Sequence, residues 1–174
     1  AAAYPKFVGG LSFSGDWKGI DLSFLFQAGL GRDVALTGVY SGGIMDNTQM
    51  TKPFYHGGNS PKYLVENSWR EDNTNAEFPR LSIVQASSNN AYSSTFWYRS
   101  GDYLRLKNLQ IGYTFPPKWM SRIGIDRLRI YFEGQNLWTV SELTKFNIDP
   151  EQPGVSNGYY PQQRIFSFGV NLAF

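Results

Sequence analysis

The sequence predicts an all-β fold of antiparallel strands, on three observations. Apolar and polar residues alternate with a period of two in five segments, and no segment shows convincing helical periodicity. The connections between these segments alternate between short and long. Aromatic residues make up 17% of the 174 residues, and with a net charge of only +2 this excludes intrinsic disorder. The sequence also has no apolar run near the 18 residues of a membrane-spanning helix.

The period-two pattern predicts strands at about 7–14, 20–29, 98–115, 127–136 and 164–174. The last segment is the clearest example, since Phe166, Phe168, Val170, Leu172 and Phe174 share one face. Small and polar residues occupy the other face. Such strands have one apolar surface and one polar surface along their whole length.

The alternation changes phase within the third segment. Leu104 and Leu106 occupy even positions, whereas Leu109 and Ile111 occupy odd positions. Because a one-residue slip moves every later side chain to the opposite face, we predict a β-bulge near Lys107–Asn108. The alternative is that one of the two apolar sets packs against other parts of the protein.

Long polar connections at about 30–97 and 137–163 alternate with short ones at 15–19 and 116–126. A structureless connection as long as 30–97 is unusual in a compact soluble domain. Short periplasmic turns and long external loops are typical of outer-membrane barrels, whose tilted strands of about ten residues cross the bilayer. The sequence therefore predicts a segment of an antiparallel transmembrane β-barrel, located in the outer membrane and in contact with its lipid.

Two other architectures stay open on this evidence. A soluble β-sandwich with one solvated face would also show alternation, and could be a carbohydrate-binding or structural module. A small independent pore would have to oligomerise, because five strands are fewer than the roughly eight that close a barrel. For the same reason, we expect the remaining strands to come from elsewhere in the same chain or from a separate chain.

Particular runs of residues resemble one family. The run from Gly101 to Pro116, GDYLRLKNLQIGYTFP, is similar to a signature of the SusC/RagA-type TonB-dependent transporters of Bacteroidetes. Further similar segments follow the family's order: Trp69 to Arg80, Leu128 to Leu137, Asp149 to Glu151 followed by Tyr160-Pro161, and Phe168 to Phe174. The resemblance covers nearly the whole chain.

The resemblance implies that the chain is the C-terminal part of a barrel of about 22 strands. It implies a plug domain and a TonB-contacting segment, both absent from this chain, and a SusD-like surface lipoprotein as partner. The implied cargo is an oligosaccharide or a peptide, imported with energy delivered through TonB. In such a protein, the terminal strand residues Phe168, Val170, Leu172 and Phe174 would form the signal read by the barrel-assembly machinery.

No enzymatic or cofactor chemistry is expected. The chain has no Cys and a single His, which removes thiolate zinc sites and histidine clusters. Asp149 and Glu151 flank a proline, so we predict a turn rather than a catalytic pair. With Asp46 they could coordinate Ca²⁺, but no calcium-loop motif is present and no metal is expected. The low net charge also argues against a nucleic-acid partner.

Two sets of candidate functional residues follow. Loop residues that could face cargo or a partner are Tyr55, Trp69, Arg70, Arg80, Trp97, Tyr98, Tyr159 and Tyr160. Aromatic residues in such loops could equally serve in packing, and Arg70 and Arg80 are predicted to anchor the loop through salt bridges. Charged residues predicted to face the lumen and the plug are Asp21, Arg105, Lys107, Arg129 and Glu133.

Overall fold

The computed structural model describes residues 2–36, 62–81, 94–153 and 162–174. The chain divides into two compact units. We call residues 6–30, 103–140 and 161–174 the sheet unit. Residues 1–5, 31–102 and 141–160 form the loop unit, which therefore consists mainly of the two long connections that the sequence predicts.

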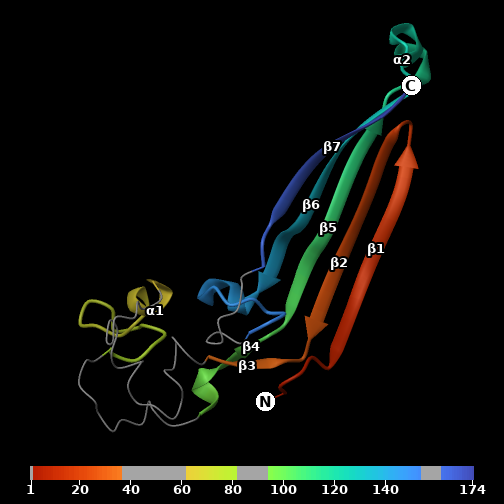
Figure 1. Cartoon of the computed structure of the whole chain (residues 1–174). Helices are drawn as coiled ribbons and strands as arrows, with labels where there is room; N and C mark the ends of the chain where they lie inside the picture. The colour runs from red at the N-terminus through yellow and green to blue at the C-terminus, as the bar shows by residue number, and fades with distance from the viewer. Residues whose placement is uncertain (1, 37–61, 82–93, 154–161) are drawn as a thin grey trace. The chain divides into compact units, whose positions relative to one another are not determined.

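The sheet unit is a five-stranded antiparallel meander (Figure 1). Its strands are β1 (Phe7–Trp17), β2 (Ile20–Leu30), β5 (Tyr103–Thr114), β6 (Arg127–Ser141) and β7 (Ile165–Ala173). They lie in the order β1-β2-β5-β6-β7, so each strand neighbours the next long strand along the chain. Their β-branched and aromatic residues alternate with small or polar ones, which suits a pleated sheet with two different faces.

Two compact connections join strands at one end of the sheet. Lys18 and Gly19 have φ angles of 50° and 88° and link β1 to β2, which is the backbone of a two-residue type I′ hairpin turn. Between β5 and β6 the chain forms α2 (Pro117–Met120) and the 3-10 turn η4 (Ser121–Ile123). The periodicity did not predict these short helices. Pro117 stands at their start and Gly124, with a φ of 76°, at their end, as helix-capping preferences require.

The predicted β-bulge in β5 is confirmed. Leu25 pairs with Asn108 and Phe26 pairs with Leu106, so the register with β2 steps over Lys107. As a result, Leu106 and Leu109 lie opposite Phe26 and Phe24, on the same face of the sheet. The bulge therefore keeps both sets of leucines on the apolar face, even though their sequence positions differ in parity.

The predicted strand 98–115 is two strands. Tyr98–Ser100 forms β4 and pairs with β3 (Asp33–Ala35) in the loop unit, whereas β5 begins at Tyr103. The break lies at Gly101-Asp102, where the Gly101 amide donates to the Arg32 carbonyl at 2.7 Å and Asp102 Oδ1 accepts from the Gly31 amide at 2.6 Å. These hydrogen bonds satisfy backbone groups that a continuous sheet would otherwise pair.

The loop unit has its own hydrophobic core. Around β3 and β4 it holds α1 (Lys62–Glu66) and the 3-10 turns η3 (Thr95–Trp97) and η5 (Glu142–Phe146). Its buried residues are Val34, Leu36, Leu64, Phe78, Trp97, Leu143, Phe146 and Ile148. The two long connections are thus packed against each other, which the sequence patterns did not predict. None of the helices in the described ranges has the length and apolar character needed to cross a membrane.

Candidate functional site

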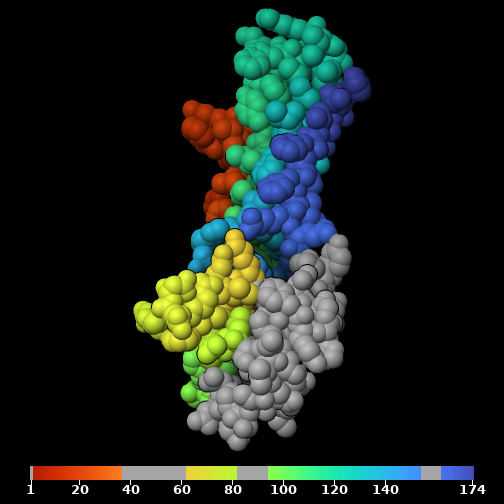
Figure 2. Space-filling model, turned by 90° about the vertical axis from the view of Figure 1, so that its left-hand side faces the viewer, coloured from red at the N-terminus to blue at the C-terminus, as the bar shows by residue number. Residues whose placement is uncertain are grey.

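One face of the sheet unit exposes a continuous apolar surface. Phe168 on β7 is 82% exposed, and Val170 on the same strand, Ile111 on β5 and Leu11 on β1 are also exposed. Phe24 and Phe132 are only half-buried, through ring contacts with Phe13 and Phe168 within the same face. Figure 2 shows β7, in blue, along the surface of this unit. Within the described residues the unit contains a single sheet, so the second layer that a β-sandwich would need is not found there.

The opposite face carries an ion pair that spans three strands. Arg129 of β6 donates from Nε to Asp21 Oδ1 of β2 at 2.9 Å, and from Nη2 to Oδ2 at 2.5 Å. Gly112 of β5 pairs with Asp21 and lies beneath this bidentate contact. A Cβ atom at Gly112 would lie 2.6 Å from both Asp21 carboxylate oxygens. Glycine at this position therefore leaves the space through which the two charges meet.

The same face continues from the ion pair onto β7. The Arg129 guanidinium lies 4.7 Å from the centre of the Tyr131 ring. Tyr131 in turn covers Gly169, its partner on β7, where an added Cβ would meet the ring. The two charges were predicted from the sequence, whereas the close approaches at Gly112 and Gly169 were not. An isolated glycine inside a strand pattern was the available signal for such a close approach.

The other residues predicted to face the lumen have different environments. Arg105 is 3% exposed and donates to Thr139 at 2.9 Å. Glu133 accepts from Gln135 Nε2 at 3.1 Å, and Lys107 is the residue at the bulge. Within the predicted set, Asp21 and Arg129 form an ion pair with each other.

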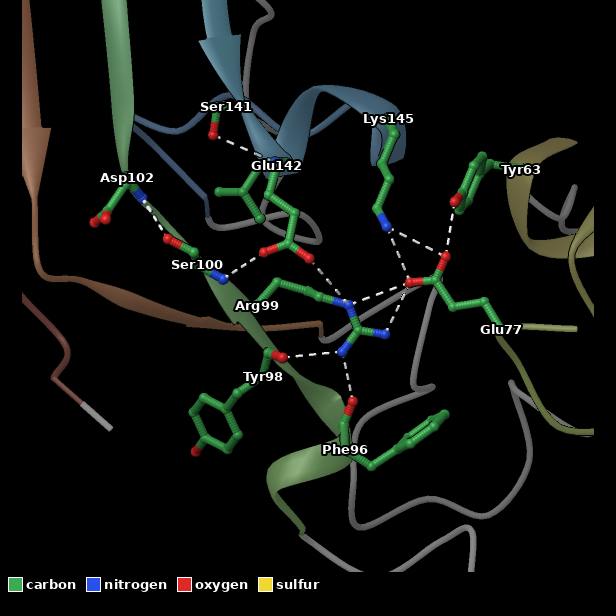
Figure 3. Close-up of polar contacts among 11 residues, drawn as sticks. Tyr63, Glu77, Phe96, Tyr98, Arg99, Ser100, Asp102, Ser141, Glu142 and Lys145 are labelled. Carbon is green, nitrogen blue, oxygen red and sulfur yellow. Dashed lines mark hydrogen bonds and ion pairs between the residues drawn. The ribbon is translucent and has the colours of Figure 1, made fainter.

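In the loop unit, Glu77 is the centre of an ionic cluster (Figure 3). Its carboxylate accepts from Tyr63 at 2.7 Å, from Lys145 at 3.2 Å and from Arg99 Nη2 at 3.1 Å. Arg99 also lies 3.7 Å from a Glu142 oxygen. Tyr63, Glu77 and Arg99 precede β5 in the chain, whereas Glu142 and Lys145 follow β6. The cluster therefore links parts of the two long connections.

The pKa of Glu77 is set by opposing effects. Burial raises it, but the hydrogen bonds from Tyr63, Lys145 and Arg99 outweigh burial and hold the pKa below its usual 4.5. The hydrogen bond to Glu77, together with burial, raises the pKa of Tyr63 above its usual 10.0. The folded loop unit thus favours ionised Glu77 and neutral Tyr63.

We expect the loop unit to be most stable between these two limits. The stabilisation from Glu77 is present above pH 4.5 and is lost as the pH falls through its lowered folded pKa. The stabilisation from Tyr63 is present below pH 10.0 and is lost as the pH rises through its raised folded pKa. Hydrogen exchange of residues 62–81, corrected for the intrinsic pH dependence of exchange, would measure this. Glu77→Gln should abolish the acid-side loss, and an unchanged acid profile in this variant would contradict the assignment.

Trp97 was predicted to face cargo or a partner, and this prediction is wrong. Its side chain is 2% exposed, stacks on Phe78 with ring centres 6.4 Å apart, and meets Phe96 edge-on. The η3 turn directs the indole into the core of the loop unit, which needs large apolar side chains to fill it. Tyr98, the adjacent candidate, is half-buried on β4.

Three of the loop candidates meet in one hollow. Trp69, Arg70 and Arg80 line a surface cavity of about 460 Å³ in the loop unit, together with Val65, Ser68, Glu71 and Leu81. Arg70 forms the predicted local salt bridge, with Asp72 at 3.2 Å. Arg80 forms no salt bridge within the described residues, so its predicted anchoring role is not seen.

The remaining predictions concern turns, metals and residues beyond the described ranges. Asp149 Oδ1 accepts from the Glu151 amide at 2.9 Å, a side-chain bond typical of the turn predicted there. Among the described residues, no three acidic or histidine side chains are grouped so that they could hold a metal ion. Tyr55, Tyr159, Tyr160 and Asp46 lie outside the described residues.

Known proteins resemble the chain in both sequence and structure. It is 28% identical to TonB-dependent receptor P3 of Formosa agariphila over 98% of the chain, and 30% identical to the receptor SusC of Bacteroides thetaiotaomicron over 59%. A solved structure of the RagAB peptide transporter matches 99% of the chain with a TM-score of 0.67 and 28% identity. No protein-family model matches the sequence.

These matches are to parts of much longer proteins. The chain spans 16% of the length of receptor P3, 10% of SusC and 17% of the matched RagAB chain. The antiparallel sheet, whose edge strands among the described residues are β1 and β7, corresponds to a portion of a barrel wall. In both sequence and fold, the chain resembles a β-barrel segment of the SusC/RagA-type TonB-dependent transporters.

Proposed function

We propose that the chain forms part of the wall and loops of an outer-membrane importer for oligosaccharides or peptides. The observation that carries this proposal is the two-faced sheet. One face exposes large apolar side chains such as Phe168, which suits contact with lipid. The other holds the paired charges Asp21 and Arg129, which suit a hydrated barrel interior.

The proposed mechanism is transport without covalent chemistry. Strand edges at β1 and β7 would pair with further strands of the barrel, because unpaired backbone groups in lipid cost several kcal/mol each. A plug would fill the lumen until energy delivered through TonB displaces it. The loop unit would help to capture cargo beneath a SusD-like surface lipoprotein. One matched structure is the RagAB peptide importer, which supports a two-component assembly of this kind.

A transport assay tests this function directly. We expect deletion of the gene to abolish growth on one class of oligosaccharide or peptide, and a plasmid copy to restore it. Intact-mass measurement of the complex purified from outer membranes should find the full transporter together with a lipoprotein. Normal uptake of every tested oligosaccharide and peptide in the deletion strain would refute the import function.

The lipid-facing assignment predicts a difference between adjacent residues of β7. Phe168→Arg should lower the stability of the folded barrel by about 2–4 kcal/mol, because it places a charge against hydrocarbon near the middle of the strand. Ser167→Arg, on the polar face opposite Glu133, should change stability little. Urea unfolding of the full-length transporter in lipid vesicles would measure both variants, and equal losses would show that the faces are assigned wrongly.

A further inference from the structure

The hollow around Trp69 is rigidly supported from the core of the loop unit. The Trp69 amide donates to the carbonyl of buried Phe78 at 2.9 Å, and the Phe78 amide donates to Asn67 at 2.9 Å. Ser68, which is 2% exposed, donates through its hydroxyl to the Leu64 carbonyl. The backbone that carries the hollow is therefore fixed before any ligand arrives, which lowers the entropic cost of binding.

The hollow offers aromatic and apolar contacts at its surface. Trp69 keeps 37% of its side chain exposed, although the other large aromatic residues nearby, Phe78 and Trp97, are buried. Val65 and Leu81 add apolar surface. A volume of about 460 Å³ lies within the range of about 300–1,000 Å³ that is usual for small-molecule sites.

Two charged side chains of the hollow, Arg80 and Glu71, are unpaired within the described residues, since neither has a hydrogen-bonding or ionic partner there. Arg70, by contrast, is engaged with Asp72. A guanidinium can only donate hydrogen bonds, and an ionised carboxylate can only accept them.

We propose that this hollow is a sugar subsite, in which one ring of an oligosaccharide stacks on the Trp69 indole and its hydroxyls bond to Arg80 and Glu71. Each hydroxyl both donates and accepts, so a sugar satisfies the two groups at once without requiring a net charge. The less polar face of the ring would cover the exposed indole. The inference rests on the import function proposed above, and it selects oligosaccharide rather than peptide as the cargo.

Binding to the purified full-length transporter with its lipoprotein tests the proposal. The probes are hexasaccharides of glucose, mannose and xylose, and a set of hexapeptides, each measured by calorimetry. We expect at least one hexasaccharide to bind. Trp69→Ala should weaken that binding at least tenfold, Arg80→Leu should weaken it several-fold, and Trp69→Phe should keep it within about threefold.

Trp119→Ala is the matched control, since Trp119 is 56% exposed on α2 in the sheet unit. It should leave binding unchanged, and heat-modifiable mobility should show that every variant is folded. Unchanged saccharide binding in Trp69→Ala, binding of peptides alone, or binding of no probe would overturn the sugar subsite. The first two results would leave the import function intact, since that function is tested separately by uptake in the deletion strain.

Discussion

Trp97→Ala should destabilise the loop unit by about 3–5 kcal/mol and leave the sheet unit folded. The indole is 2% exposed and contacts both Phe78 and Phe96. Its removal would leave a cavity between segments that are distant in the sequence, and a small core has few other contacts with which to compensate. Hydrogen exchange of residues 62–81 and 142–148 in the full-length protein would report the loss.

Phe96→Ala provides the matched control for this prediction. Phe96 precedes Trp97 in the same turn but is 44% exposed, so its removal should cost much less. Similar increases in exchange for the two variants would show that the aromatic core does not hold the long connections together. An increase in the exchange of β2 and β5 as large as that of the loop unit would show that the two units do not unfold separately.

Gly19→Val should reduce the amount of folded transporter in the outer membrane more than any other glycine substitution in the turns. Gly19 has a φ of 88°, where valine is strained by about 1–3 kcal/mol. An added Cβ would also lie 2.7 Å from the Thr114 carbonyl oxygen, and such overpacking costs about 1–3 kcal/mol more. Urea unfolding in detergent and the folded fraction on gels would measure the effect.

Gly124→Val separates the two contributions to this loss. Gly124 has a similar φ of 76°, but no atom lies within 4 Å of the position of its Cβ. This variant should therefore show only the backbone strain. If Gly124→Val and Gly19→Val lost the same stability, contact with the Thr114 carbonyl could not be the reason why the turn requires glycine.

The sequence predicted the sheet well because period-two alternation is a local property. Each strand shows its two faces without reference to its neighbours, and the change of parity between Leu106 and Leu109 was enough to locate the bulge. The strand ends were less predictable. Hydrogen bonds of Gly101 and Asp102 with Arg32 and Gly31, which are distant in the sequence, divide one continuous apolar pattern into β4 and β5. Periodicity carries no information about such bonds.

The candidate site was only partly predictable for a related reason. Trp69 and Trp97 are both tryptophans in a long polar connection, yet one remains exposed at a hollow and the other fills the core. The difference depends on which segments pack around each residue. Arg70 and Arg80 differ in the same way, since Asp72 is within reach of only one of them.

The amino-acid pattern by itself determined the strand faces, the bulge and the resemblance to a transporter family, because these depend on neighbouring residues along the chain. Only the tertiary structure decided that Asp21 meets Arg129 across Gly112, and that Glu77 binds Arg99 and Lys145. The members of these contacts lie far apart in the sequence. Their distances follow from strand register and loop packing, which a single sequence does not encode in any local pattern.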